Sequence, residues 1–167
     1  MVVFFVIVLN MKIELRDTKN GKGVFATKEF ILGEVVIEFT GKIFKGDELP
    51  DPYNNVVDHY IQVGVNEYIG PSGKLDDFIN HSCSPNAGLF FTDKGIFLKT
   101  INKIGAGEEI TFDYSTTMLD DDWTMKCDCG SNKCRKIIKE FRFLPEETKE
   151  RYIQLGIVPN YVLIKQQ

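Results

Sequence analysis

Three cysteines lie close together near the C-terminal end of the chain, where Cys127, Cys129 and Cys134 form the pattern C-x-C-x4-C. A disulfide between cysteines separated by one residue would be strained, and neighbouring thiolates repel one another unless a cation neutralises them. Zinc in a structural site takes four ligands in a tetrahedron. The fourth cysteine of the chain, Cys83, lies in the segment NHSCSPN (80–86), so one four-cysteine zinc site would use every cysteine.

Such a site would join the C-terminal loop to a turn that lies much earlier in the sequence. Structural zinc contributes folding free energy directly, so we expect the loop to be disordered without metal and to act as a lid. Two alternatives stay open. One is a three-cysteine loop completed by water or by His59, and the other is a loop that holds no metal.

Three further stretches carry polar or aromatic residues where strands are expected to begin or end. They are the Gly-x-Gly turn NGKGVFA (20–26), the polar turn FINHSCSPN (78–86) and the strand end EEITFDY (108–114). Taken alone, each is more typical of an ordinary turn or of core packing than of a site. Their order along the chain, with the cysteine loop after them, makes them candidate site segments.

Short apolar runs punctuated by Gly, Asn and Asp predict strands, because each has strand length and is rich in β-branched or aromatic residues. The best helix covers 144–156, with Pro145 at the first helical position and Gly156 as its stop. The pattern predicts a mostly-β domain with a few short helices. The predicted strands cover residues 2–9, 34–39, 59–65, 95–100 and 108–114.

The apolar start of the chain is too short to span a bilayer, and it lacks the basic region and cleavage site of a signal peptide. We interpret residues 1–10 as a buried strand, or as an extension upstream of a natural start at Met11. Without a secretion signal a reducing compartment is expected, and clustered cysteines then favour metal over disulfides.

One segment of the sequence resembles another. Residues 28–37 (KEFILGEVVI) and 102–111 (NKIGAGEEIT) align as turn, Gly-Glu and strand, so that Gly33 matches Gly107 and Glu34 matches Glu108. This similarity indicates a pseudo-duplicated β fold, with chance similarity between two glycine turns as the alternative.

Composition limits the classes of function. The 167 residues fit one domain, and 43% hydrophobic residues with 26% charged residues are ordinary for a globular protein. The net charge of −4 and the pI near 5.3 argue against a nucleic-acid binder that works through a basic face. A mildly acidic surface suits a basic partner better. Thirteen Phe and six Tyr predict an aromatic-rich interior or cleft.

In this order and spacing, the four stretches resemble the SET-domain protein lysine methyltransferases with a post-SET zinc loop, over about residues 11–140. The resemblance implies a mostly-β SET (β-clip) fold of small curved sheets. Its NHS and DY segments would cross in a knot-like active site, followed by a zinc-stapled loop and a short C-terminal helix. The implied divisions are residues 1–10, an apolar strand or extension; 11–116, the SET domain; 123–139, the post-SET zinc loop; and 140–167, the C-terminal helix and tail.

The resemblance also implies two cofactors, S-adenosylmethionine and one structural zinc ion held by the four cysteines. The backbone at Lys22 and Gly23, the Asn80 amide and the His81 main chain would hold S-adenosylmethionine. Trp123 would stack on the adenine. Tyr114 would touch both the cofactor and the substrate.

For catalysis, the resemblance implies Tyr114 as the catalytic tyrosine, Tyr60 as a second channel tyrosine and Phe112 as the residue that limits how many methyl groups fit. Methyl transfer needs a neutral amine, and an apolar aromatic channel disfavours the ammonium form of lysine. Because Phe112 lacks the hydroxyl that a Tyr would place there, we predict di- or trimethylation.

The sequence departs from the family pattern at KLDD before FINH, so Asp76 and Asp77 are expected to alter cofactor or substrate contacts, and no cysteine-rich pre-SET segment precedes the fold. The acidic run LDDDW (119–123) is a solvated loop or a site that attracts a basic peptide. The predicted partner is a lysine-bearing basic protein such as a histone. Direct nucleic-acid binding, membrane association and oligomerisation are not expected.

Two other functions stay open: a catalytically inactive SET-fold module that binds zinc, and a zinc-ribbon interaction protein without a cofactor. The expected location is intracellular. A nuclear, a cytoplasmic and an exported-effector location are not separated by the sequence.

Overall fold

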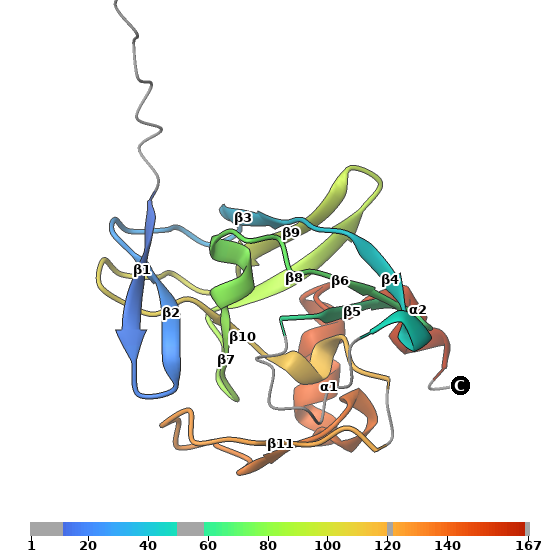
Figure 1. The fold of residues 1–167 in the computed structure, drawn as a ribbon. Coiled ribbons are helices and arrows are strands. Elements are labelled where there is room, and N and C mark those ends of the chain that lie inside the picture. Colours follow the sequence, from blue (N-terminus) through green and yellow to red (C-terminus); the bar gives the residue numbers. More distant parts are fainter. Residues whose placement is uncertain (1–11, 50–58, 120–121, 166–167) are drawn as a thin grey trace, which may run out of the picture.

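The computed structural model describes residues 12–49, 59–119 and 122–165. The predicted strand over residues 2–9 lies outside these ranges. Short strands dominate and form several small sheets, with two short helices near the C-terminal end (Figure 1). The elements in the first part are β1 (Ile13–Thr18), β2 (Gly21–Ala26), β3 (Val35–Phe39), β4 (Ile43–Lys45), β5 (Ile61–Gly64), β6 (Glu67–Ile69) and β7 (Asn80–His81). The later ones are β8 (Ala87–Thr92), β9 (Gly95–Thr100), β10 (Thr111–Phe112), β11 (Met125–Lys126), β12 (Ile137–Ile138), α1 (Glu146–Gln154) and α2 (Asn160–Ile164).

Three of the sheets contain the longer strands. β1 and β2 form an antiparallel hairpin, β3, β9 and β8 form a three-stranded sheet in that order, and β4, β6 and β5 form another. Single turns of 3-10 helix connect or follow these strands at 46–48, 75–78, 114–116 and 141–143. The prediction of a mostly-β domain is confirmed.

Strands β7 and β10 bring two distant segments together at the centre of the fold (Figure 1). They pair in parallel, with Asn80 opposite Thr111 and His81 opposite Phe112. The Ser82 N–H then donates to the Phe112 carbonyl at 3.1 Å. The two segments that carry the NHS and FDY residues therefore lie side by side, as the resemblance implies.

The two similar segments pair with each other. Phe30 and Ile104, which occupy matching positions in the two segments, exchange backbone hydrogen bonds of 2.9 and 3.1 Å. Gly33 and Gly107 both adopt positive φ, at 81° and 88°. The matching is symmetric, because the Gly33 N–H donates to Thr100 and the Gly107 N–H donates to Ala26. The two segments are therefore related by a local two-fold axis. This symmetry supports a pseudo-duplicated fold over chance similarity between two glycine turns.

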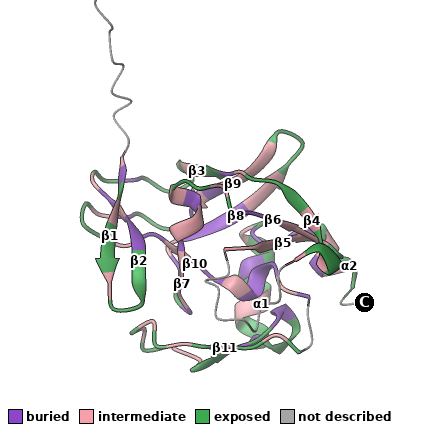
Figure 2. Cartoon of the chain, viewed as in Figure 1, coloured by how far each residue is buried: buried purple, intermediate pink, exposed green. Residues whose placement is uncertain are grey.

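Buried side chains among the described residues form two clusters, and Figure 2 marks the buried residues along the chain. The first lies between the hairpin and the β3–β9–β8 sheet, and it includes Phe112. The second lies under the C-terminal helices and consists of Ile101, Leu119, Phe141, Leu144, Tyr152, Ile157, Val158 and Val162. The C-terminal segment is therefore packed onto the β core.

The predicted C-terminal helix is present as α1, with a second short helix, α2, after it. Pro145 stands at the N-cap of α1, one position before the place that the sequence predicts, and Gly156 follows the helix with a φ of 69°. Neither helix, nor any other among the described residues, is long and apolar enough to cross a membrane.

Replacing Gly88 with Ala is expected to loosen the C-terminal segment. A Cβ at Gly88 in β8 would lie 2.8 Å from the Ile157 Cβ, and Ile157 is buried. Overpacking of this kind costs about 1–3 kcal/mol of unfolding free energy, which urea titration would measure. Gly105→Ala is the matched control, because its nearest neighbour would lie at 3.5 Å. Equal stability of the two variants would contradict this packing.

Candidate functional site

The four cysteines come together from two separate parts of the chain. The Sγ atoms of Cys83, Cys127, Cys129 and Cys134 all lie within 4.8 Å of one another. Two of the separations, Cys83 to Cys127 at 3.9 Å and Cys127 to Cys134 at 3.7 Å, match the roughly 3.8 Å between sulfurs that zinc–sulfur bonds of ~2.3 Å give in a tetrahedron. The predicted grouping is confirmed, and His59 lies elsewhere, with its ring against Phe78 at 5.4 Å.

The protonation of these thiols is consistent with a metal site. Burial raises the pKa of Cys127 to about 12 and also raises that of Cys83. Burial acts in the same direction on Cys129, but hydrogen bonds from the backbone at Cys83 and Ser131 outweigh it and lower its pKa to about 7. A divalent cation would replace the thiol protons and balance the thiolate charges. The donor set therefore fits a structural zinc ion.

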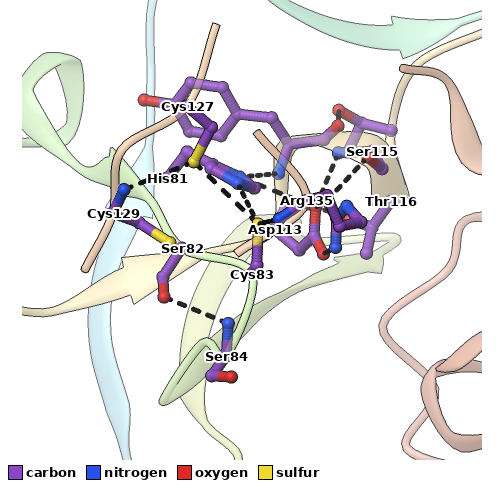
Figure 3. Close-up of polar contacts among 12 residues, drawn as sticks. His81, Ser82, Cys83, Ser84, Asp113, Ser115, Thr116, Cys127, Cys129 and Arg135 are labelled. Atoms are coloured by element: carbon purple, nitrogen blue, oxygen red, sulfur yellow. Dashed lines mark hydrogen bonds and ion pairs between the residues drawn. The ribbon is translucent and has the colours of Figure 1, made fainter. Parts of the chain in front are cut away.

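The His81 side chain contacts both the cysteine cluster and Tyr114, and Figure 3 shows it beside Cys83. Its Nδ1 accepts a hydrogen bond from the Tyr114 N–H at 3.2 Å, and its Nε2 lies 3.3 Å from the Cys83 Sγ. Burial lowers the pKa of His81 to about 4, with Asp113 opposing this and Arg135 adding to it. The imidazole is therefore neutral, with its proton on Nε2 facing the sulfur. The sequence predicts a role for the main chain of His81. In the structure its side chain also contacts both Cys83 and Tyr114.

A buried ion pair lies next to the cluster (Figure 3). The Arg135 guanidinium donates to both carboxylate oxygens of Asp113 at 2.7 Å, and the Asp113 side chain is fully buried. The Tyr152 hydroxyl of α1 donates to the same carboxylate at 3.1 Å. Burial and the neighbouring Asp113 raise the pKa of Tyr152, so its hydroxyl keeps the proton that it donates.

A cavity of about 590 Å³ runs between the hairpin turn and the β4–β6–β5 sheet. One end is polar, and the rest is lined mostly by aromatic and apolar side chains. This is the aromatic-rich cleft that the composition predicts. The aromatic and imidazole rings that line it belong to Phe39, His59, Tyr60, Tyr68, Phe78, Phe112, Tyr114 and Trp123.

The polar end lies where β2 meets β7. The Asn80 side-chain amide donates to the Lys22 carbonyl at 2.9 Å and to the Glu109 carboxylate at 2.7 Å. Gly23 is buried beside them, and a Cβ there would collide with Glu109 and lie 2.8 Å from the Asn80 amide nitrogen. The glycine thus allows the hairpin backbone to approach this turn closely.

The cysteine loop reaches across to the hairpin turn at the same end. The Asn20 amide donates to the Asp128 carboxylate at 3.0 Å, and the Lys19 Nζ lies 3.0 Å from the same carboxylate. Thr124 and Met125 of the loop line the cavity together with Trp123. The loop therefore covers the polar end, in the place of the predicted lid.

Tyr114, Phe112 and Tyr60 all line the aromatic part of the cavity. The Tyr114 hydroxyl donates to the Ile79 carbonyl at 2.8 Å, and its ring centroid lies 4.9 Å from that of Phe112. The Tyr60 ring packs edge-on against Phe44 at 5.5 Å. Of the predicted site residues other than the cysteines, Gly23 and His81 directly follow the lining residues Lys22 and Asn80 in the chain, and all the others line the cavity.

The SET domain family model matches residues 21–115, which is more than half of the 167-residue chain. The chain belongs to the SET domain family. The match includes Lys22, Asn80 and Tyr114 and ends at Ser115. The cysteine loop and the C-terminal helices lie beyond the matched SET region.

Relatives of this SET protein include proteins named as histone-lysine methyltransferases. Trithorax of Drosophila virilis is 32% identical over 141 residues, covering 74% of this chain and 3% of that protein. The probable histone-lysine N-methyltransferase set-23 of Caenorhabditis briggsae is 29% identical over 150 residues, covering 78% of this chain and 61% of that protein. The chain therefore spans less than two thirds of the length of each of these relatives.

Solved SET structures share the fold. Two crystal structures of KRYPTONITE superpose with TM-scores of 0.61 and 0.62, at 22% and 23% identity, covering 76% and 77% of this chain and 29% of each KRYPTONITE chain. One is a complex with mCHH DNA, an H3(1-15) peptide and SAH, and the other is a complex with mCHG DNA and SAH. The predicted SET fold is confirmed.

Asp76 and Asp77, which depart from the SET pattern, are held by the turn in which they lie. Asp76 is buried and accepts hydrogen bonds from the Thr40 N–H at 2.9 Å and the Ser72 hydroxyl at 2.7 Å. Asp77 accepts from the backbone N–H groups of Ser72 and Gly73 at 2.8 and 2.7 Å. Both residues line the cavity, and these contacts give both acids a role in closing the turn.

Sequence reasoning missed Glu109, Asp113, Arg135 and Tyr152. Arg135 directly follows Cys134, so the cysteine spacing itself could have placed it near the site. Glu109 lies in the quoted EEITFDY stretch, but nothing in the sequence separates it from Glu108. Glu108 instead binds the Gly105 N–H within its own turn at 2.5 Å. Nothing near Tyr152 in the sequence indicates a functional role, because an aromatic residue on a short helix is typical of core packing.

Proposed function

We propose that this SET protein is a protein-lysine N-methyltransferase that uses S-adenosylmethionine. One observation carries the proposal: a single cavity joins the polar Lys22–Asn80 end, beneath the cysteine loop, to an aromatic end at Tyr114 and Tyr60. A methyl donor and an amine acceptor need this kind of continuous space. The relatives named as histone-lysine methyltransferases and the KRYPTONITE complexes with SAH support the same activity.

The polar end is the proposed cofactor site. The backbone at Lys22 and Gly23, the Asn80 amide with its support from Glu109, and the main chain at His81 would hold the donor, with Trp123 against the adenine. The cavity volume of about 590 Å³ lies within the usual range for small-molecule sites. When bound, S-adenosylmethionine supplies an electrophilic methyl group on a sulfonium.

The aromatic end is the proposed lysine site. A free lysine amine has a pKa of about 10.4, and it must lose a proton before it can attack. The apolar walls formed by Phe112, Tyr60 and Tyr114 disfavour the ammonium form and so ease that loss. Tyr114, fixed at both its N–H and its hydroxyl, would orient the methyl group through weak C–H···O contacts. In this transfer the bond from nitrogen to methyl would form as the bond from sulfur to methyl breaks, and the donor would leave as a neutral thioether.

The proposed substrate is a lysine in a basic protein, with a histone tail as the first candidate. The net charge of −4 favours a basic partner, and the named relatives act on histones. The acidic run 119–123 lies partly outside the described residues, and within the described part Asp122 is exposed. A histone substrate favours a nuclear location over an exported effector.

Phe112→Tyr is expected to shift the products from di- and trimethyl-lysine toward monomethyl-lysine. Phe112 is buried against Phe39 and Tyr114, and an added hydroxyl would occupy space and bind the amine or a water beside it. Mass spectrometry of a methylated peptide at matched turnover would measure the product ratio. Phe39→Tyr, on the neighbouring ring, is the comparison variant. An unchanged distribution in Phe112→Tyr would remove the proposed role of this residue.

The activity itself is tested with zinc-loaded protein, radiolabelled S-adenosylmethionine and a panel of basic proteins that includes core histones. Label that appears on lysine, and that falls about 100-fold or more in the Tyr114→Phe variant, would support the proposed methyltransferase activity. Cofactor binding measured by calorimetry, with no label on any panel member, would mean that the panel lacks the substrate. Absence of both would favour an inactive zinc-stapled module.

A further inference from the structure

The residue before Tyr114, Asp113, holds together three separate parts of the chain. Its carboxylate accepts two 2.7 Å hydrogen bonds from Arg135 of the cysteine loop and one of 3.1 Å from Tyr152 of α1. It also accepts the Ser115 N–H at 3.1 Å, and it is fully buried. A carboxylate held at both oxygens by charge-assisted bonds has a fixed orientation.

Ser115, on the other side of Tyr114, is tied to the same C-terminal segment. Its hydroxyl donates to the Lys139 carbonyl at 2.6 Å and accepts from the Arg135 guanidinium at 3.1 Å. Both neighbours of Tyr114 are therefore anchored by residues that come after the SET match, which ends at Ser115. Tyr114 itself is held at its N–H by His81 and at its hydroxyl by Ile79.

Arg135 connects this network to the cysteine cluster. Its backbone N–H lies 3.4 Å from the Cys83 Sγ, and it directly follows Cys134 (Figure 3). Closing the metal site would therefore place the guanidinium, because the main chain at Arg135 is fixed by the cluster. Tyr152 is buried in the C-terminal core, which fixes the other donor to Asp113.

We propose that Arg135 and Tyr152 act through Asp113 as positioning residues for Tyr114, so that the cysteine loop and helix α1 both belong to the catalytic apparatus. The catalytic role of Tyr114 in this statement rests on the proposed function. The helix α1 then does more than cover a core. Its Tyr152 hydroxyl supplies one of the contacts that decide where the Tyr114 side chain stands relative to the two ends of the cavity.

Tyr152→Phe removes one hydroxyl and keeps the ring in the core. Tyr161→Phe is the matched control. Its partly buried hydroxyl lies 2.7 and 2.9 Å from the carbonyl oxygens of Gln62 and Thr117, which share its single proton, and it lies outside the Asp113 network. Arg135→Lys keeps the charge but loses the two-nitrogen contact, and Arg135→Met removes the charge as well.

The decisive readout is ¹⁹F NMR of protein labelled with 3-fluorotyrosine, which gives six signals, one for each Tyr. Tyr114→Phe identifies the Tyr114 signal. We expect Tyr152→Phe and Arg135→Lys to shift or broaden the Tyr114 signal, and Tyr161→Phe to leave it in place. This readout needs neither substrate nor turnover, so it decides the positioning role even where the wild-type protein transfers no methyl group.

Kinetics supply the second readout. We expect kcat to fall about 3- to 10-fold in Tyr152→Phe and further in Arg135→Lys, with KM for S-adenosylmethionine within about two-fold of wild type. Arg135→Lys is expected to retain part of the kcat that Arg135→Met loses. An unchanged Tyr114 signal in both Tyr152→Phe and Arg135→Lys, at a stability loss equal to that of Tyr161→Phe, would overturn the proposal.

Discussion

Removal of zinc by a chelator is expected to lower the Tm by about 10 °C or more, because losing a few kcal/mol of binding free energy shifts the Tm of a chain this size by that amount. Cys83→Ser should have the same effect in the presence of metal. The cysteine loop has few other attachments to the core. They include the contacts of Arg135 with Asp113 and Ser115 and the hydrogen bond from Ser115 to the Lys139 carbonyl. The hydrogen bond between Ser84 and Ser131 and the exposed contacts of Asp128 with Lys19 and Asn20 add to them.

The same treatment is expected to weaken S-adenosylmethionine binding by about 10-fold or more, since the loop supplies part of the cavity wall over its polar end. Differential scanning calorimetry and titration calorimetry would measure the two effects, with zinc released into a chromogenic chelator counted against protein. Lys133→Ala is the control, because Lys133 is exposed in the same loop and is not a ligand. A chelated protein with unchanged Tm and affinity would show that the cysteine cluster holds no structural metal.

Asn80→Ala is expected to weaken S-adenosylmethionine binding by about 10- to 100-fold, the equivalent of about 1–3 kcal/mol for a lost hydrogen-bonding group. The Asn80 amide joins the Lys22 carbonyl to the Glu109 carboxylate, and its loss would remove this direct hydrogen bond between the hairpin and β7. Titration calorimetry of the cofactor, with thermal unfolding as a check on folding, would measure the effect.

Two variants make this result specific to Asn80. Asn80→Asp keeps the size of the side chain but places a carboxylate beside Glu109, so it should bind the cofactor no better than Asn80→Ala. Asn66→Ala removes an exposed asparagine whose side chain accepts the Gly46 N–H at 3.1 Å and does not line the cavity, so this variant should bind like wild type. Wild-type affinity in both Asn80 variants would place the cofactor away from this end of the cavity.

The parts of the site that chemistry constrains were predictable from the sequence. Four cysteines at such spacing have few uses other than a shared metal, and the structure brings Cys83 to the other three. The strand around Phe112 followed from an apolar run bounded by turns, whereas β7 at His81 lies in a segment that the sequence predicts as a polar turn. The local two-fold was visible as a repeated Gly-Glu turn, at Gly33 and at Gly107, because both turns need positive φ.

Other parts of the site depend on contacts that no local pattern encodes. Asp113 and Tyr152 meet only because α1 packs back onto the β core, and nothing near Tyr152 in the sequence signals a carboxylate partner. Asp76 and Asp77 stood out as a departure in the sequence, yet their partners are the N–H groups and hydroxyl of a single turn together with Thr40. The N-terminal strand stays a prediction, as do the predicted end of the SET domain at 116 and the predicted start of the post-SET loop at 123.

The hydrogen bonds that Phe30 and Ile104 exchange are those of an isologous contact, the kind that joins two identical subunits on a two-fold axis. The two repeated segments therefore meet as two halves related by a pseudo-two-fold axis. Continuing the alignment past the repeated turns, Glu38 and Thr40 in the first copy stand where Phe112 and Tyr114 stand in the second. The residues proposed for chemistry are thus found where the two halves no longer match.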